Sequence, residues 1–185
     1  KSSPNTFLKG VEQAKSMLAG IYYCFYDDSP AYITPYTYEN MCDNSYNHHT
    51  WEFSAEFASG TQTAASWWAE LKWTKDWQAI SRANSLIRSM ALATGIGPAD
   101  SRKILAEARF LRALAYYWLV TEWGDVPLVL KALESAEEVR ANNYRRPKAE
   151  VYQAIFDDLK YVTESPLADV QPASACGKVS KSAAW

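Results

Sequence analysis

The chain has 185 residues, of which 48% are hydrophobic and 22% are charged, and its formal net charge is -2 at pH 7. This length and composition are typical of a single folded domain with a substantial core. A nearly neutral chain offers no concentrated basic surface for phosphate groups, so we expect no nucleic-acid partner. No window approaches the roughly 18 apolar residues of a membrane span.

Aromatic residues and cysteines are the informative minority. The 8 Trp and 12 Tyr exceed what packing alone usually demands, and both side chains join a large apolar face to a polar group. The three cysteines, Cys24, Cys42 and Cys176, are odd in number and lack metal-ligand spacing, which argues against a disulfide framework or a zinc site. At most one pair could bridge, and three buried or half-buried thiols are the simpler expectation.

The first predicted element is an amphipathic helix that ends near Tyr26. Ser3 and Pro4 form a helix-start pattern, with serine as the N-cap and proline in the first turn. Apolar residues then recur at helical spacing, namely Leu8, Val11, Leu18, Ile21, Tyr22 and Phe25.

Residues 27–66 break this periodicity. Prolines, asparagines and a glycine interrupt aromatics that are scattered among polar residues. We predict a long, mostly irregular excursion within the domain, and loops of that length are usually functional.

Helical spacing resumes at Trp67 and continues to Met90, before a breaker cluster at 95–98. Asp100 or Ser101 can cap the next helix, which runs to Trp123. That helix is apolar on most of its faces, so it must be covered on most of them and should lie at the centre of a helical stack.

The second half of the chain begins at Gly124, which fits a left-handed helix end, followed by an extended segment at 125–129. A polar link at 134–146 leads to a last clear helix with Pro147 near its start, and residues 177–185 resemble a loop entering another helix. The stripe expected to be buried on the last clear helix is Val151, Ile155, Leu159 and Val162.

The helices predicted between Trp67 and Thr163 are each about long enough for a helix-turn-helix repeat, which predicts an all-α scaffold of the tetratricopeptide kind, in which each unit is buried against its neighbours. No 34-residue sequence repeat is visible, so helix length and order carry this expectation.

Several blocks resemble the SusD/RagB family of outer-membrane nutrient-binding lipoproteins of Bacteroidetes. The central one is EARFLRALAYY at 107–117, followed by WGDVPLV at 123–129. The pattern ISRAN at 80–84, the helix EVYQAIFDDL at 150–159 and GKVSKSAA at 177–184 are also similar to family blocks and stand in the same order.

This resemblance implies a surface glycan-binding protein on the outward-facing side of the outer membrane. Such a protein would capture oligosaccharides and deliver them to a SusC-like TonB-dependent transporter. It would be held by an N-terminal lipid anchor that this chain does not contain. Residues 1–185 would then form the N-terminal helical domain of a longer protein. No cofactor and no enzymatic activity are expected.

Most charged candidates have an ordinary structural interpretation. Arg109 and Arg112 lie on one helical face and are expected to pair with acidic groups such as Glu107, Glu122 or Asp125 rather than to bind an anion. Trp123 and the Tyr116–Tyr117 pair are expected in the core.

Acidic and histidine clusters also give no clear site. His48, His49, Glu52 and Glu56 lack the spacing of a zinc helix. Asp157 and Asp158 are expected to be solvated, and neither a nucleophile elbow nor a defensible carboxylate pair is present.

The excursion supplies the candidate ligand-binding residues. It combines carboxylate, amide and hydroxyl groups with aromatic rings, which suits carbohydrate, since a ring covers the apolar face of a sugar while short polar groups bind its hydroxyls. Because Trp67 and Trp68 are consecutive on a helix, they point about 100° apart and at most one should be exposed. The predicted ligand-binding residues are Asp43, Asn44, Tyr46, Trp51, Trp67 and Trp68.

Two other functions remain open at this point. Some relatives handle oligopeptides, so an oligopeptide-binding RagB-like lid protein is one alternative. The other is a helical protein-interaction scaffold with no small ligand, favoured if the excursion packs entirely inward.

Overall fold

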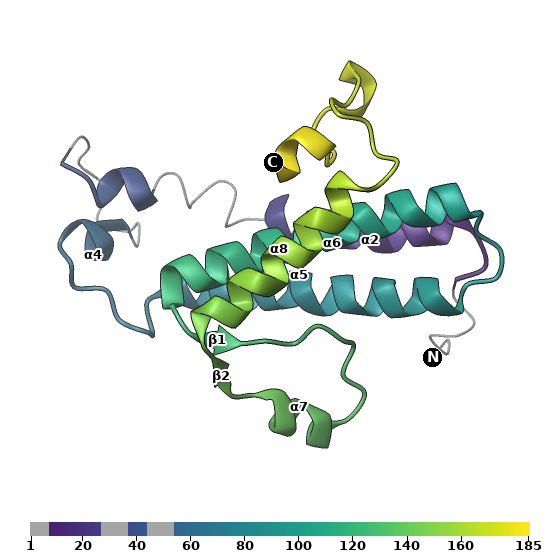
Figure 1. Cartoon of the computed structure of the whole chain (residues 1–185). Helices are drawn as coiled ribbons and strands as arrows, with labels where there is room; N and C mark the ends of the chain where they lie inside the picture. The colour runs from purple at the N-terminus through teal and green to yellow at the C-terminus, as the bar shows by residue number, and fades with distance from the viewer. Residues whose placement is uncertain (1–7, 27–36, 44–53) are drawn as a thin grey trace.

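The computed structural model of the chain describes residues 8–26, 37–43 and 54–185. Helices dominate this part of the chain (Figure 1). The long helices are α2 (Val11–Tyr26), α5 (Trp67–Leu92), α6 (Pro98–Trp123) and α8 (Lys148–Thr163). The prediction of an all-α, tetratricopeptide-like scaffold is confirmed. The shorter helices are α4 (Ser54–Ala58), α7 (Ala136–Asn142), η1 (Ala173–Ala175) and η2 (Lys181–Ala184).

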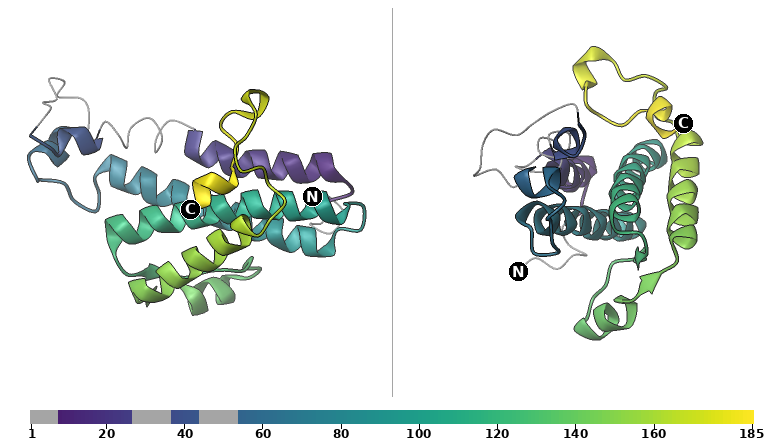
Figure 2. Two further views of the ribbon diagram at one scale, coloured as in Figure 1. Left: turned by 45° about the horizontal axis from the view of Figure 1, so that its top comes forward. Right: turned by 90° about the vertical axis from the view of Figure 1, so that its left-hand side faces the viewer.

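Helix α6 occupies the centre of the stack. It contacts α2, α5 and α8, and the right-hand view of Figure 2 shows α8 on the side of α6 away from α2 and α5. Its buried residues are distributed around most of its circumference, as the sequence predicts for a helix that is apolar on most faces. They include Ile104, Ala108, Leu111, Ala115, Tyr116 and Leu119.

Two helix starts differ from the prediction. Helix α6 begins at Pro98 with Gly97 as its N-cap, and not after Asp100 or Ser101. Proline in the first turn needs no hydrogen bond for its nitrogen and already has a helical φ, which explains the earlier start. Helix α2 begins at Val11, since residues 8–10 are not helical, while Ser3 and Pro4 lie outside the described residues.

The segment between α6 and α8 contains structure that the sequence analysis missed. The predicted polar link holds α7 and the strand β2 (Arg145–Arg146), which pairs antiparallel with β1 (Val126–Pro127). Ser135 caps α7 by accepting the backbone N–H of Glu138 at 3.1 Å. No residue of α7 is buried, so this helix has no apolar stripe from which it could be recognised.

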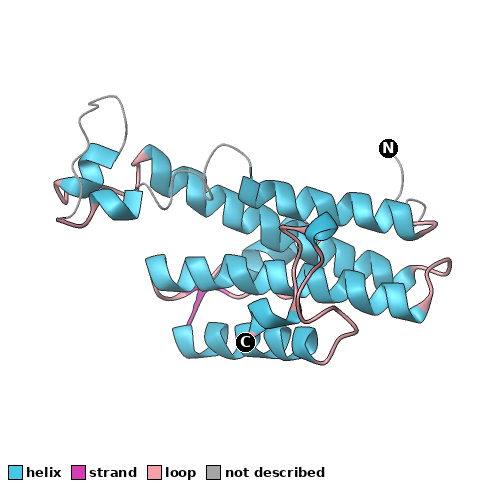
Figure 3. Ribbon diagram, turned by 90° about the horizontal axis from the view of Figure 1, so that it is seen from above, coloured by secondary structure: helices cyan, strands magenta, loops and turns pink. Residues whose placement is uncertain are grey.

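The described parts of the excursion, residues 37–43 and 54–66, contain two short helical pieces. A helical turn covers 37–40, and α4 is a helix of 5 residues. Both lie at one end of the bundle, next to the start of α5 (Figure 3). Phe57 of α4 and Trp68 of α5 form a small hydrophobic cluster apart from the main core. This second cluster holds α4 against the helical platform.

The last segment of the chain returns to the bundle. Tyr22 of α2 donates a hydrogen bond to Glu107 of α6 at 2.7 Å and accepts the backbone N–H of Val179 at 3.0 Å. The expected helical turn near the end is present as η2, which packs on α8.

Candidate ligand-binding site

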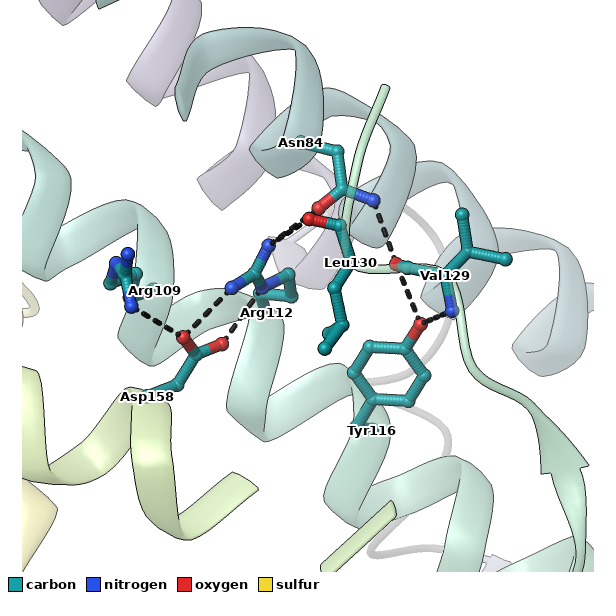
Figure 4. A network of polar contacts seen from close by, with 7 residues as sticks. All are labelled: Asn84, Arg109, Arg112, Tyr116, Val129, Leu130 and Asp158. Atoms are coloured by element: carbon teal, nitrogen blue, oxygen red, sulfur yellow. Dashed lines mark hydrogen bonds and ion pairs between the residues drawn. The ribbon is translucent and has the colours of Figure 1, made fainter. Parts of the chain in front are cut away.

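A buried polar network joins four parts of the chain beside the bundle core. Arg112 of α6 donates two hydrogen bonds to the carboxylate of Asp158 on α8, both at 2.8 Å (Figure 4). A third nitrogen of the same guanidinium donates to Asn84 Oδ1 at 2.6 Å and to the carbonyl of Leu130 at 3.1 Å. Arg109 adds a contact to Asp158 at 3.2 Å.

The network continues to the extended segment after β1. Asn84 Nδ2 donates to the carbonyl of Val129 at 2.8 Å. The hydroxyl of Tyr116 donates to that carbonyl at 2.9 Å and accepts the N–H of Val129 at 2.7 Å (Figure 4). The blocks that contain Asn84, Arg112, Tyr116 and Asp158 are therefore brought to one place in the fold.

This arrangement is structural. The prediction that the arginines pair with acidic groups is confirmed, but the partner is Asp158, not Glu107, Glu122 or Asp125. The prediction that Asp158 is solvated is wrong, because the residue is 3% exposed. The bidentate pair engages the carboxylate of Asp158, and the third guanidinium nitrogen of Arg112 donates to Asn84 and Leu130, so this guanidinium is held by the protein itself.

Aromatic packing accounts for much of the tryptophan content. Edge-to-face contacts join Trp73 to Trp77 and Trp123, with ring centroids 5.7 Å and 5.4 Å apart, and join Trp77 to Tyr116 at 6.1 Å. Trp123 and Tyr116 thus lie in or against the core as predicted, but Tyr117 is 49% exposed and does not. The abundance of tryptophan therefore indicates helix packing here more than ligand binding.

A pocket of about 640 Å³ opens where the excursion meets α5 and α6, and we call it the front pocket. Its aromatic and apolar lining is Tyr38, Met41, Phe57, Ala64, Trp68, Ala69 and Trp123. Its polar lining is Gln62, Thr63, Thr121 and Glu122. The size is in the range of small-molecule sites, and the mixture of rings with a few polar groups is their usual composition.

The rings of the front pocket support one another. Trp68 packs edge-to-face against Phe57 with centroids 5.0 Å apart and against Tyr38 at 6.2 Å. Trp68 is only 5% exposed, so its neighbours in the protein cover most of its ring.

The predicted ligand-binding residues are only partly covered by the structure. Asn44, Tyr46 and Trp51 lie outside the described residues. Among the others, Trp68 lines the front pocket, whereas Asp43 is exposed at the end of the 37–43 segment and does not line it. Trp67 is 50% exposed and also lies outside the lining, which confirms that at most one of the two consecutive tryptophans is exposed.

Sequence reasoning missed Tyr38, Phe57 and Glu122 as lining residues. Tyr38 and Phe57 belong to the predicted excursion, and no local pattern distinguishes them from its other aromatics. Glu122 stands in the turn of α6 before the Trp-Gly signal, where sequence reasoning treated it as a partner for an arginine. Only the approach of the excursion to the end of α6 reveals it.

A buried charge cluster lies beneath the front pocket, formed by Lys72 and Asp76 of α5 and Glu122 of α6. Lys72 Nζ is 2.8 Å from Asp76 Oδ2 and 3.5 Å from Glu122 Oε1. The ammonium also lies 3.9 Å from the ring centre of Trp118, a cation–π contact. The hydroxyl of Tyr38 donates a short hydrogen bond to Glu122 and so ties the 37–43 segment to α6.

Burial controls the titration of this cluster. Desolvation raises the pKa of Asp76 to about 7, although Lys72 favours the charged form. Desolvation also raises the pKa of Glu122, again against the effect of Lys72. The pKa of the Tyr38 hydroxyl is raised by burial and by its hydrogen bond to Glu122, so Tyr38 remains a donor at neutral pH.

A second, smaller cavity of about 310 Å³ lies between α5 and the segment that carries α7. Its lining includes Trp77, Ile80, Ser81, Asn142 and Asn143. It has one aromatic ring, which is already engaged in the core, so the front pocket is the better candidate for a sugar.

The described residues show neither a metal site nor a membrane-spanning helix. Across residues 8–26, 37–43 and 54–185, no group of His, Cys, Asp or Glu is arranged to hold a metal ion, and His48, His49 and Glu52 lie outside these ranges. No helix within the same ranges has the length and apolarity to cross a membrane. All three cysteines are free, with Cys24 buried and Cys42 and Cys176 exposed.

Solved structures share this fold. A SusD-like carbohydrate-binding protein from Bacteroides fragilis superposes with a TM-score of 0.82 over 97% of this chain and 36% of its own, at 23% identity. A laminarin-binding SusD-like protein gives a TM-score of 0.80 over 95% of this chain and 38% of its own, at 21% identity. A third structure, whose description includes a xylogluco-oligosaccharide, gives 0.71 over 94% of this chain and 32% of its own, at 24% identity.

Sequence comparison gives the same family. SusD-like protein P25 of Formosa agariphila is 26% identical over 98% of this chain, which spans only 36% of that relative's length. A SusD-like protein of Bacteroides ovatus is 30% identical over 50% of the chain and 17% of its own length. The sequence model of a SusD-like family, described as starch-binding and associating with the outer membrane, matches residues 1–185, so the chain belongs to the SusD-like family.

Proposed function

We propose that this protein binds an oligosaccharide in the front pocket and delivers it to a SusC-like TonB-dependent transporter of the outer membrane. One observation carries the proposal: the pocket joins packed aromatic rings to the hydroxyl, amide and carboxylate groups of Thr121, Gln62 and Glu122. Rings that cover the apolar face of a sugar and polar groups that bind its hydroxyls are what carbohydrate recognition requires.

The ligands named for two structural relatives favour carbohydrate. One relative is described as laminarin-binding, and another was solved with a xylogluco-oligosaccharide. These ligands belong to those proteins, and they define the first probes to use here.

Binding without catalysis fits the pocket. Most glycoside hydrolases place two carboxyl groups across the bond that is cleaved. In the described lining of the front pocket, Glu122 is the single carboxylate, and Lys72 and Tyr38 already engage it. We therefore propose a capture protein and not an enzyme, facing outward from the outer membrane and held there by an N-terminal lipid.

The test is to obstruct the pocket without disturbing the core. Thr121 is exposed on α6 and lines the pocket, so Thr121→Arg places a long side chain across it. We expect the Kd for the glycan to rise at least roughly tenfold, which is a loss of about 1.4 kcal/mol of binding free energy. Gln153→Arg, on the exposed face of α8, is the matched control and should bind normally.

Binding should be measured by calorimetry on the full chain, first with laminarin and xylogluco-oligosaccharides, then with a wider glycan array and a peptide pool. Affinity should be nearly insensitive to salt, because neutral sugars release no counterions. Binding of peptides but no glycan would replace the carbohydrate proposal with an oligopeptide ligand. Equal glycan affinity of Thr121→Arg and Gln153→Arg would move the site away from the front pocket.

The residues expected from sequence extend the proposed site. We propose that Asp43, Asn44, Tyr46, Trp51, Trp67 and Trp68 contribute to the ligand surface, with Trp68 forming the inner wall of the pocket. Asp43→Ala and Trp67→Ala alter exposed side chains and should each weaken glycan binding. Full affinity in both variants would remove these outer contacts from the site while leaving the family membership intact.

A further inference from the structure

We propose that Lys72, Asp76 and Glu122 form a clasp that carries one proton and, through Tyr38, fixes the wall of the front pocket. The inference rests on the proposed function of that pocket and concerns its regulation. Asp76 and Glu122 act as positioning residues for Tyr38. The hydroxyl of Tyr38 donates to Glu122 and so links the 37–43 segment to the cluster.

The first argument is the count of charges. Two carboxylates contact one ammonium, and the exposed fractions of the Lys72, Asp76 and Glu122 side chains are 1%, 1% and 12%. With all three ionised, the cluster carries a net charge of −1 where little water can compensate it. A proton on one carboxylate makes the cluster neutral, which avoids the cost of an uncompensated buried charge.

The second argument comes from unsatisfied acceptors. Asp76 Oδ1 and Glu122 Oε2 are both buried, and neither has a hydrogen-bond partner among the described residues. An ionised carboxylate can only accept hydrogen bonds, so both oxygens lack a donor. A buried neutral hydroxyl without a partner costs less than a buried ionised oxygen without one, so the missing donors favour a proton on one of the two carboxyls.

Other charged groups near Asp76 do not supply the missing positive charge. The charged groups that act on Asp76 are Lys72 and Glu122. On α2, Asp76 acts electrostatically on the thiol of Cys24, to which Arg82 donates at 3.2 Å. Lys75 of α5 lies over the ring of Tyr23, 5.9 Å from its centre. On the pocket side the neighbours are the neutral hydroxyls of Tyr38 and Tyr117.

The clasp reaches the pocket through Glu122. This residue both belongs to the cluster and lines the front pocket, and it accepts the hydrogen bond of Tyr38. When Asp76 loses its proton, both carboxylates are charged, and Glu122, the more exposed of the two, turns toward the water in the pocket. The hydroxyl of Tyr38 then loses its hydrogen bond to Glu122, and the ring of Tyr38 separates from that of Trp68.

The direction of the pH effect follows from the pKa of Asp76, which burial raises from an ordinary value of 3.8 to about 7. Between about pH 4 and pH 7, the folded chain keeps a proton that the unfolded chain has lost. The free energy of unfolding therefore falls as the pH rises through this window, and the contribution levels off above about pH 7.

The first experiment measures that proton without any ligand. The side-chain carboxyl carbons of the aspartates are labelled with ¹³C in the wild-type full chain and titrated by NMR. One aspartate should titrate with a midpoint near pH 7, and its signal should be missing in Asp76→Asn. Titration of every aspartate below about pH 5 would overturn the proposal.

The second experiment measures stability. Asp76→Asn keeps the shape of a protonated carboxyl at every pH. The ratio of its folding equilibrium constant to that of the wild type should rise at least about tenfold between about pH 5 and pH 8, because only the wild type pays for ionisation. Glu70→Gln, an exposed carboxylate on the same helix, is the matched control and should give a constant ratio. A constant ratio for Asp76→Asn would contradict the clasp.

The third experiment tests the connection to the pocket. In the wild type, the protection of the 37–43 amides from hydrogen exchange should fall as the pH rises from about 6 to 8, after correction for intrinsic rates. Tyr38→Phe should give low protection at both pH values while Asp76 still titrates near neutral pH. Tyr144→Phe, which alters an exposed hydroxyl that Arg146 contacts, should behave as wild type.

A pH-independent protection pattern in the wild type would separate the proton from the pocket and overturn this part of the proposal. None of these measurements needs a glycan, so they remain readable if the proposed function fails. With laminarin as the probe, affinity should fall between about pH 6 and 8 in the wild type and stay flat in Tyr38→Phe. Parallel pH curves for these two proteins would also contradict the clasp.

Discussion

Arg112 joins four parts of the fold through one side chain. Its two hydrogen bonds to Asp158 connect α6 to α8, and its contacts to Asn84 and Leu130 connect both to α5 and to the segment after β1. A buried ion pair of this kind adds little compared with an apolar packing of the same shape, but removing one partner leaves the other charged and unpaired.

We therefore predict that Arg112→Ala lowers the free energy of unfolding by about 3–5 kcal/mol. Arg88→Ala is the matched control, because Arg88 forms an exposed ion pair with Glu134 that should be worth less than about 1 kcal/mol. Urea titration followed by circular dichroism measures both. Similar losses in the two variants would show that the Arg112 network does not hold the helices together.

Asp158 also shows where residue-level prediction fell short. Consecutive helical residues point about 100° apart, so Asp157 and Asp158 face different surroundings, as Trp67 and Trp68 do. Asp157 is exposed and Asp158 is buried, just as Trp67 is half exposed and Trp68 is buried. Helical geometry indicates that one of two consecutive residues faces the core. An aspartate can be buried there only if a partner such as Arg112, distant in the sequence, compensates its charge. No local pattern identifies that partner.

At the scale of elements, Gly124 determines how α6 ends. Its φ is 70° and its ψ is −121°, so the positive φ expected from sequence is confirmed, although ψ lies outside the left-handed helical region. The backbone N–H of Gly124 still closes the last turn by donating to the carbonyl of Val120 at 3.1 Å. This conformation sends the chain out of the helix and into β1.

We predict that Gly124→Ala lowers the free energy of unfolding by about 1–3 kcal/mol, because a side chain is strained at this φ even where space is free. Gly20→Ala should have the opposite effect, a gain of about 0.5–1 kcal/mol, because Gly20 lies inside α2 with nothing near the added methyl group. Thermal and urea unfolding of the two variants test the contrast. A destabilised Gly20→Ala with an unaffected Gly124→Ala would reverse the argument.

The long helices were predictable because each carries a sustained apolar period or a clear stop signal. Helix α5 begins at Trp67 as expected, and α8 starts directly after Pro147. Helix α7 could not be recognised because it is short and buries no residue, and its capping serine resembles that of an ordinary turn. The start of α6 was misplaced because two acceptable caps followed a proline that already favours a helical start.

For the molecule as a whole, the reaction rates of the cysteine thiols measure how often the helical bundle unfolds. Cys24 is 2% exposed between α2 and α5, and burial raises the pKa of its thiol. Cys42 and Cys176 are exposed. Since the thiolate is the reactive form, both burial and the raised pKa slow any reaction at Cys24.

We predict that two thiols react rapidly with a disulfide reagent in the native protein and that the third reacts only when the bundle opens. The slow rate should follow the free energy of unfolding, so Arg112→Ala should accelerate it. In Cys24→Ala the slow phase should disappear while the fast phase keeps its amplitude. Rapid reaction of three thiols in the native protein would mean that α2 separates from α5 without global unfolding.

The candidate site depends on long-range packing more than the helices do. Trp68 could be named from the sequence, but Tyr38 and Glu122 meet only because residues 84 positions apart are brought together by the packing of the excursion on α6. Composition could indicate that aromatic and polar groups are gathered in the excursion. It could not separate the rings that line the pocket from those that pack between α5 and α6.

The two-residue pairing of Val126 with Arg146 and of Pro127 with Arg145 fastens the base of the arm that carries α7. Because the two strands are paired at the base of the arm, a change in the length of the arm need not change the angle between α6 and α8. Chain-closure entropy grows slowly, by about 0.6 kcal/mol for each doubling of length. Residues added to the arm of this chain should therefore cost little stability and leave the packing of α6 on α8 unchanged.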